Sequence, residues 1–173
     1  MYNFDHNNRK GCILGGNFVR WYGGFDSYIV AHELTPEENL YCVSMGRKQK
    51  EESESLIQNL TYLPYMNWKE WLESLNSFKY AIHLMPTIAA GTFGMNCSYL
   101  GIPCIGYSQA DTQRILHPNL SIEFNEIGKA RELVRELKNN SYFYNKCSQE
   151  TKQLWNEYFS EKVFLQKMKQ ILV

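Results

Sequence analysis

The sequence predicts an α/β protein: a Rossmann-like, doubly wound parallel sheet in three α/β/α layers, with further helices at the C-terminus. Short apolar segments with little polar alternation recur along the chain, which is typical of parallel strands buried on both faces. Helical segments separate them, and such alternation favours a parallel sheet with right-handed crossovers. About six strands are expected, near residues 12–15, 40–45, 60–63, 80–85, 103–107 and 120–123.

The start of the chain, residues 1–10, is polar and carries no apolar pattern. We therefore expect a linker or disordered start there, followed by a single domain over 11–173. The first strand ends in glycines and leads into a helix expected over Phe25–Leu34. After the second strand, a basic run predicts the solvated start of a charged helix that reaches Ile57.

The helix after the third strand has clear local signals. Asn67 is a good N-cap, and Glu70 three residues later predicts a capping box. An apolar stripe at positions i, i+3, i+4 and i+7 then predicts an amphipathic helix over 67–78 that packs on the sheet.

The last third of the chain is predicted to be mainly helical. A short helix is expected to run to Leu116, with Asp111 as its N-cap. Apolar residues at helical spacing predict a helix over Glu126–Leu137. Two more helical stretches are expected over Ser141–Val173, with a bend near Ser160.

The charge balance excludes some partners. Lys and Arg together number 18, as do Asp and Glu, so the formal net charge is zero. A protein that binds nucleic acid or an acidic membrane through bulk electrostatics is normally basic, so we expect no nucleic-acid partner.

No apolar run approaches the ~20 residues that span a bilayer, and the polar start lacks the core of a signal peptide. We therefore expect a cytoplasmic protein with no transmembrane segment.

The five cysteines and the histidines give no sign of a metal site. The cysteines are scattered and form no C-x-x-C pair, which points to a reducing compartment. His32 and His117 have no ligand-like neighbours in sequence. His83 falls within an apolar strand, where a hydrogen-bonded core histidine is expected. We predict neither a bound metal nor a cofactor.

The stretch Gly91-Thr92-Phe93-Gly94 follows the fourth strand and predicts a ligand-binding loop. Its glycines let bare backbone approach a ligand, and a helix is expected to start at Phe93 or Gly94. A helix N-terminus presents unpaired N–H groups and a positive dipole end, which favour an anion. In open α/β sheets, ligands bind beyond the carboxyl ends of the strands, and this loop lies at such an end.

The order of these motifs resembles a known family. Pro86-Thr87, the Gly91–Gly94 loop, a helix and then the run from Gly101 to Gly106 resemble the C-terminal domain of GT-B-fold, group 1-like retaining glycosyltransferases. That family typically has a strand ending in Pro-Ser, a Phe-Gly turn, and Gly-x-Pro-Val-Ile. The resemblance covers nearly the whole chain. It implies a nucleotide-sugar substrate, an N-terminal acceptor-binding domain missing from this chain, and no turnover by this chain alone.

The resemblance, with the loop chemistry, implies the donor-contacting residues. In the family, basic side chains of the first loop contact the donor diphosphate, and Arg20 is the base left in that loop. Arg47 directly follows a strand-end glycine, so it could point into the crevice. In the family, the loop that corresponds to the one before the 67–78 helix holds the nucleotide base. The expected nucleotide-sugar-binding residues are Asn17, Arg20, Arg47, Tyr65, Met66, Gly91, Thr92, Phe93, Gly94 and Asn96. For Arg20 and Arg47, a solvated surface position remains the alternative.

The family's two glutamates, eight positions apart, would fall at Ile88 and Asn96, so no catalytic residue is assigned. The Asn96 amide can still hydrogen-bond a ribose or sugar hydroxyl. Two alternatives stay open: a nucleotide-sugar 2-epimerase-like domain, and a degenerate GT-B module without catalysis. In the resembled family the last helix packs on the other domain, so part of 155–170 is expected to be under-packed when this domain is alone.

Overall fold

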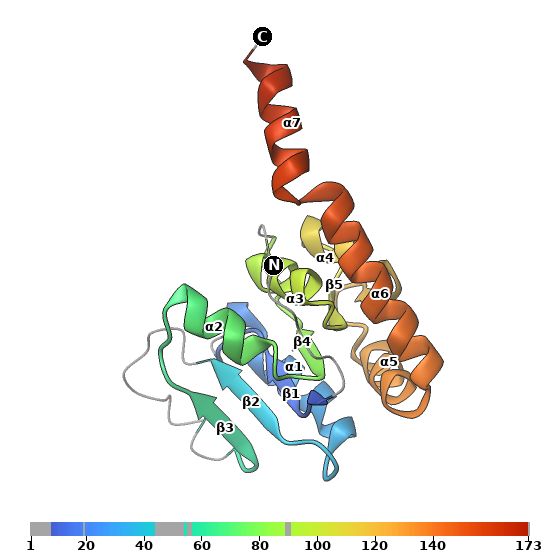
Figure 1. Cartoon of the computed structure of the whole chain (residues 1–173). Helices are drawn as coiled ribbons and strands as arrows, with labels where there is room; N and C mark the ends of the chain where they lie inside the picture. Colours follow the sequence, from blue (N-terminus) through green and yellow to red (C-terminus); the bar gives the residue numbers. More distant parts are fainter. Residues whose placement is uncertain (1–7, 19, 44–53, 55–56, 89–90, 173) are drawn as a thin grey trace.

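The protein is organised around a six-stranded parallel sheet (Figure 1). The computed structural model describes residues 8–18, 20–43, 54, 57–88 and 91–172. The strands are β1 (Cys12–Leu14), β2 (Leu40–Val43), β3 (Leu60–Leu63), β4 (Tyr80–His83), β5 (Cys104–Tyr107) and β6 (Ser121–Ile122). Their order is β3-β2-β1-β4-β5-β6, so the winding reverses between β1 and β4. The predicted doubly wound sheet and its six strands are confirmed.

Helices cover both faces of the sheet (Figure 1). The helices of the chain are α1 (Gly24–Ala31), α2 (Trp68–Leu75), α3 (Thr92–Leu100), α4 (Asp111–Leu116), α5 (Ile127–Asn139), α6 (Ser141–Tyr158) and α7 (Glu161–Ile171), of which α7 does not cover the sheet. Helices α1 and α5 contribute to the core on one face, and α2 and α3 to the core on the other. Helix α6 packs against α3, α4 and α5.

The central strands β1, β4 and β5 lack polar alternation because both of their faces are buried. In β1, Cys12 and Leu14 belong to the core beneath α1 and α5, whereas Ile13 belongs to the core beneath α2 and α3. All three side chains are fully buried. The apolar pattern therefore predicted the layers correctly, since a strand covered on one face alone would alternate.

Arg9 corrects the expectation for the start of the chain, because it is buried within the stretch predicted to be a linker. Its guanidinium donates to the carbonyl oxygens of Leu100 at 2.7 Å and Gly101 at 3.3 Å, and to both oxygens of Asn76. Carbonyls at a helix C-terminus lack partners within the helix, and arginine offers five donors. Residue 9 thus belongs to the folded domain.

Two helix starts match local chemistry and one does not. At α2 the predicted capping box is present: Glu70 N donates to Asn67 Oδ1 at 3.0 Å, and Asn67 N donates to Glu70 Oε2 at 2.9 Å. At α3 the helix begins at Thr92, one residue before the expected range. The N-cap prediction for Asp111 is wrong: Ala110 is the N-cap, and the Asp111 carboxylate pairs with Arg114 at 2.8 Å.

The remaining boundaries differ in detail. Helix α1 starts at Gly24, and the last turn of the helix expected to Leu34 is the 3-10 turn η3 (His32–Leu34). The charged helix expected before Ile57 lies largely outside the described residues. The bend near Ser160 is confirmed, since α6 ends at Tyr158 and α7 begins at Glu161, with Ser160 in an extended conformation at the N-cap position.

Helix α7 projects from the domain (Figure 1). None of its residues is buried, and the exposed fractions of Phe164 and Ile171 are 59% and 76%. The predicted under-packing of this segment is therefore what the structure shows for α7. Among the described residues, no helix has the length and apolar character needed to cross a membrane.

Candidate functional site

The loops that follow β1 and β4 meet where the winding of the sheet reverses, which is where open α/β sheets bind ligands. A Cβ on Gly23 would lie 1.8 Å from the Leu84 carbonyl oxygen, and Gly23 has a φ of +67°. A Cβ on Gly15 would lie 2.6 Å from the Phe93 ring. Only glycine permits these approaches. A hydrogen bond of 2.9 Å from Thr87 Oγ1 to the Trp21 carbonyl also joins the two loops.

The N-terminus of α3 opens into this junction. Its N-cap, Gly91, has a φ of +66° and provides no side-chain cap, and the first turn contains no acidic residue. The first N–H groups of a helix have no partner within the helix, and those of Thr92, Phe93 and Gly94 have none among the described residues. Together with the positive end of the helix dipole they favour an anion.

Neighbouring helices hold this first turn in place. His117 Nε2 donates to the Gly94 carbonyl at 3.0 Å, and His117 Nδ1 lies 3.0 Å from the Thr151 hydroxyl of α6. Burial lowers the pKa of His117 to about 4, so the imidazole is neutral near pH 7. Thr112 Oγ1 donates to the Gly91 carbonyl at 3.1 Å. These hydrogen bonds to the Gly91 and Gly94 carbonyls hold the first turn of α3 in a fixed position.

His83 ends β4 directly beneath this turn and differs from the expectation for it. Its ring meets the Phe93 ring edge-on, with centroids 5.1 Å apart. The Nε2 atom is buried and has no hydrogen-bond partner among the described residues, so the prediction of a hydrogen-bonded core histidine is wrong for this nitrogen. Burial lowers the pKa of His83 to about 4, which leaves the ring neutral near pH 7.

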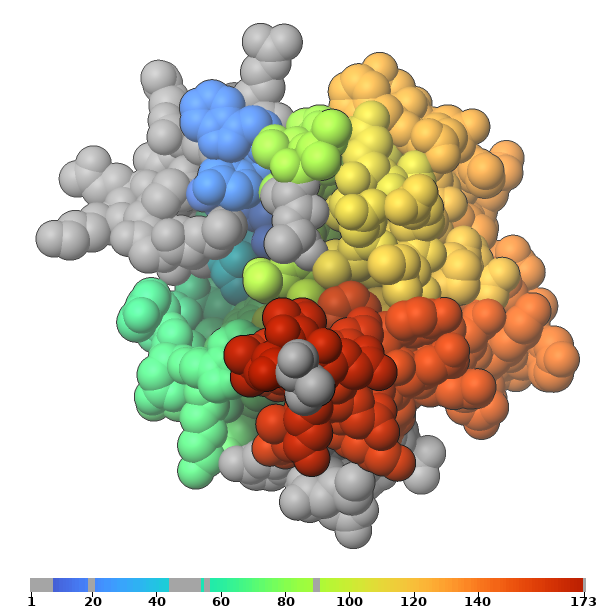
Figure 2. All heavy atoms as spheres, turned by 90° about the horizontal axis from the view of Figure 1, so that it is seen from above, coloured from blue at the N-terminus to red at the C-terminus, as the bar shows by residue number. Residues whose placement is uncertain are grey.

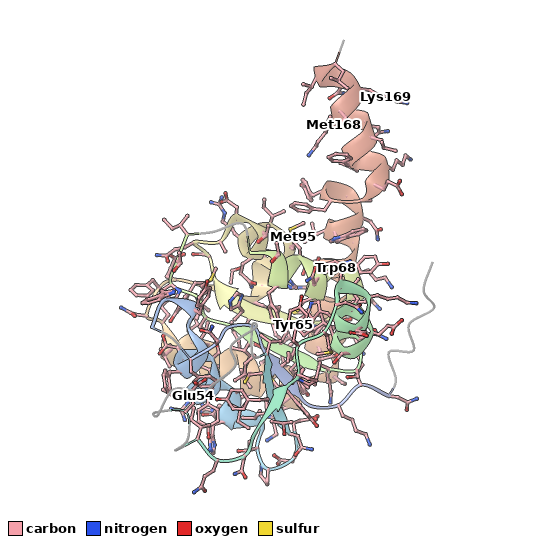
Figure 3. The ribbon with its side chains drawn as sticks, turned by 90° about the vertical axis from the view of Figure 1, so that its left-hand side faces the viewer. Glu54, Tyr65, Trp68, Met95, Met168 and Lys169 are labelled. Atoms are coloured by element: carbon pink, nitrogen blue, oxygen red, sulfur yellow. The ribbon has the colours of Figure 1, made fainter. Side chains whose placement is uncertain are left out.

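An open groove of about 530 Å³ runs beside the α3 N-terminus. Trp68 of α2, Met95 and Asn96 of α3 and Trp155 of α6 are among the residues that line it. Figure 3 shows Trp68 and Met95 near one another, and Tyr65 on the loop before α2. With its amide oriented to satisfy its neighbours, Asn96 accepts from Trp71 Nε1 at 3.2 Å. The groove is therefore lined mainly by aromatic and apolar side chains, together with the Asn96 amide, whose oxygen already accepts a hydrogen bond from Trp71.

The structure brings most of the predicted site residues to this end of the sheet. The residues from Gly91 to Gly94 form the start of α3, and Asn96 lies one turn further. Arg20 begins the 3-10 turn η2 (Arg20–Tyr22) within the β1 loop. In the loop before α2, Tyr65 is 80% exposed and Met66 is half-buried.

For two of the predicted site residues, the structure shows no side chain exposed at this end of the sheet. Asn17 is buried, and its carbonyl accepts the N–H of Gly24 at 3.1 Å. Arg47 lies outside the described residues.

Sequence reasoning missed His83, Trp68 and Met95. His83 is the last residue of an apolar strand that ends at a ligand loop, and this position is a usable signal. Trp68 directly follows a recognisable N-cap and is 62% exposed, which is unusual for so large an apolar side chain. Nothing in sequence marks Met95. The described residues contain no group of three or more His, Cys, Asp or Glu side chains that would hold a metal ion.

We compared the chain with known protein families, curated sequences and solved structures, and only solved structures show a similarity, which is one of fold. No protein-family model and no curated protein sequence matches the chain. Among solved structures, the chain is similar to the C-terminal domain of a group 1 family glycosyl transferase, LpcC from Francisella tularensis. The TM-score is 0.67 at 12% identity, over 88% of each chain. The fold is thus that of a glycosyltransferase C-terminal domain, as expected from the motifs.

Two longer proteins of known structure are similar along nearly the whole of this chain. HepE from Anabaena, in complex with UDP-glucose, gives a TM-score of 0.77 at 9% identity, over 96% of this chain and 49% of HepE. A TarM variant from S. aureus, in complex with fondaparinux, α-GlcNAc-glycerol and UDP, gives 0.73 at 15% identity, over 98% of this chain and 37% of TarM. The chain therefore spans less than half the length of these two proteins.

Proposed function

We propose that this chain is the donor-binding domain of a glycosyltransferase, which transfers a sugar from a nucleoside diphosphate to an acceptor. The observation that carries the proposal is the start of α3. This helix N-terminus has no side-chain cap and no acidic residue in its first turn, and it lies where the winding of the sheet reverses between β1 and β4. Hydrogen bonds from His117 and Thr112 hold it in place. The similar structures of HepE and TarM hold UDP-glucose and UDP, which supports this assignment.

The chemical share of this domain is electrostatic. The N–H groups of Thr92, Phe93 and Gly94 bind the diphosphate, and Arg20 and Arg47 add positive charge. Negative charge grows on the diphosphate as the bond to the sugar breaks, so fixed N–H donors and arginines stabilise the departing group. The nucleoside diphosphate sugar is a substrate, and neither a metal ion nor a cofactor enters this proposal.

The groove beside α3 receives the nucleoside. Trp68 lines the groove, and Tyr65 and Met66 lie on the loop just before it in the chain; together they offer an apolar surface for the base, since every base has a face that stacks on aromatic side chains. Asn96 offers its amide to a ribose hydroxyl and keeps its contact with Trp71. Which base and which sugar are preferred depends on contacts along this groove.

The acceptor is bound by a second domain outside this chain. This chain spans 49% of HepE and 37% of TarM, which leaves room for such a domain in an enzyme of that size. Helix α7 exposes Phe164, Leu165 and Met168 and supplies an apolar surface for packing between domains. Alone, the chain is expected to bind donor and to turn nothing over.

One observation favours a second candidate, a binding module without catalysis. If Gly101-Ile102-Pro103 anchors the resemblance, the family's two glutamates would fall near Ile88 and Asn96, and Ile88 is 82% exposed. A carboxylate at either position is therefore absent from this chain. Donor binding by α3 does not require these carboxylates, so both candidates share the site and differ in turnover.

Calorimetry with UDP, GDP, ADP and their sugars tests donor binding. We expect a Kd of tens to hundreds of micromolar for the preferred nucleotide, about −5 to −6 kcal/mol. Arg20→Ala removes one charge-assisted contact, worth about 1.5–3 kcal/mol, and is expected to weaken binding at least tenfold. Lys129→Ala, on α5 at the opposite face, is the matched control. The proposal fails if no ligand at millimolar concentration produces heat or a chemical-shift change.

A further inference from the structure

A small recess lies under the first turn of α3. His83, Met85, Gly91, Gly94, Thr112 and Gln113 are among the residues that line it. Its volume is about 10 Å³. A space of that size holds about one water molecule, so it admits one oxygen atom and not a larger group.

His83 is fixed at the edge of this recess. A Cβ on Gly15 would lie 2.7 Å from His83 Cγ, so the imidazole packs directly on bare backbone. The Phe93 ring meets it edge-on. The loop after β1 and helix α3 therefore set the orientation of the His83 ring. The buried Nε2 of His83 has no partner among the described residues. Buried polar atoms nearly always have a partner, so an exception calls for an explanation.

His117 shows that bracing the helix does not explain His83. Both imidazoles lie close to the first turn of α3, and both are neutral near pH 7 because burial lowers each pKa to about 4. His117 uses Nε2 for Gly94 and Nδ1 for Thr151. His83 makes no such bond with Nε2, so this nitrogen is dispensable for holding α3.

The surroundings of His83 explain which chemistry it offers. Gly15 of the β1 loop, Phe93 and Gly94 of α3, and Thr112 and Gln113 of α4 bring no charged group to the ring. A neutral imidazole has one N–H donor and one acceptor nitrogen. Because the recess adjoins helix N–H groups that favour an anion, the matching ligand atom is an oxygen that accepts a hydrogen bond.

We propose that His83 is a recognition residue of the donor site, whose Nε2–H donates a hydrogen bond to one phosphate oxygen of the nucleoside diphosphate at the first turn of α3. This inference rests on the proposed function. It differs from it in naming a side-chain contact that the helix N-terminus alone does not supply.

Imidazole NMR of the ¹⁵N-labelled chain, titrated with UDP and with UDP-glucose, tests the contact. We expect the His83 Nε2 signal to shift with the same saturation curve as the Phe93 and Gly94 amides. His32, on η3 and away from α3, is the control within the same molecule, and its signal is expected to stay in place. This readout needs no substitution, so it holds even where a variant fails to fold.

Two variants sharpen the test. His83→Leu removes the donor and is expected to weaken UDP binding about tenfold, whereas His83→Gln keeps an N–H at a similar reach and is expected to retain most of the affinity. Amide shifts without a His83 shift, or unchanged UDP affinity in His83→Leu, would show that the recess holds water only and overturn the inference, while donor binding stands.

The remaining outcomes separate the sources of the oxygen. An effect of His83→Leu with UDP-glucose but not with UDP would assign the oxygen to the sugar and overturn the phosphate contact. If neither the amides nor His83 respond at millimolar ligand, the proposed function itself fails and the inference falls with it.

Discussion

The first turn of α3 and the helix α7 differ in how far the rest of the chain packs against them. Phe93 and Gly94 are buried, and His117 and Thr112 hydrogen-bond the carbonyls around them. Helix α7 buries nothing, although it carries an apolar stripe (Figure 2, where α7 is seen nearly end-on). The first turn of α3 is thus packed and hydrogen-bonded by other parts of this chain. Helix α7 instead presents an apolar surface that the described part of the chain leaves uncovered.

Hydrogen exchange measures this difference directly and is expected to show the largest effect. Amides of β4 and the second half of α3 should exchange only through near-global opening. Amides of α7 should open locally, because few buried contacts hold that helix. We expect at least about a 1,000-fold difference in protection, or about 4 kcal/mol. Equal protection of 161–171 and the central strands would show that α7 is packed after all.

Glycine substitution tests how tightly the α3 side is built. Gly23→Ala places a Cβ 1.8 Å from the Leu84 carbonyl at a φ of +67°, and we expect a loss of about 3 kcal/mol of unfolding free energy or more. Gly128→Ala is the matched control, because nothing lies within 4 Å of its Cβ position in α5. It should raise stability by up to about 1 kcal/mol. Denaturant unfolding of both variants decides; equal effects would contradict the packing described.

Acid is expected to loosen the α3 side through His117. Its pKa is about 4 when folded, against 6.5 when unfolded, because burial disfavours the charged ring. The unfolded chain therefore binds more protons between these values, so stability is full above pH 6.5 and falls as pH drops toward 4. We expect a loss of about 2–3 kcal/mol from this group.

Unfolding curves at pH 7.5 and pH 4.5, for the parent chain and His117→Gln, check this prediction. The variant should be less stable at pH 7.5 and less sensitive to acid. An unchanged pH dependence in His117→Gln would show that other groups cause the acid loss. Exchange of α7 amides should not follow the titration.

The smallest effect is expected in α7. Phe164 is 59% exposed, so Phe164→Ser should change the unfolding free energy by less than about 0.5 kcal/mol. Leu100→Ala is the comparison in α3: that side chain is fully buried, and its truncation should cost about 2–5 kcal/mol. A large loss for Phe164→Ser, measured by thermal and denaturant unfolding, would reveal packing of α7.

Prediction from sequence succeeded where a residue's partners are its neighbours along the chain. The capping box of Asn67 and Glu70 joins positions three apart, and the glycine that starts α3 is followed directly by its helix. The N-cap assignment of Asp111 failed because this carboxylate pairs with Arg114, also three positions away, so two local partners competed.

What the sequence determined by itself is the parallel, doubly wound sheet and the place of the glycine loop at the start of α3. Both depend on residues close together in the chain: short apolar runs for the strands, and glycines for the turn into the helix. Only the tertiary structure decided the roles of the histidines and of Arg9. The sequence does not show which ring nitrogens of His83 and His117 have partners: contacts from distant elements leave His83 Nε2 without one among the described residues and engage both nitrogens of His117. Such roles depend on which strands and helices meet in space, and no local pattern encodes that.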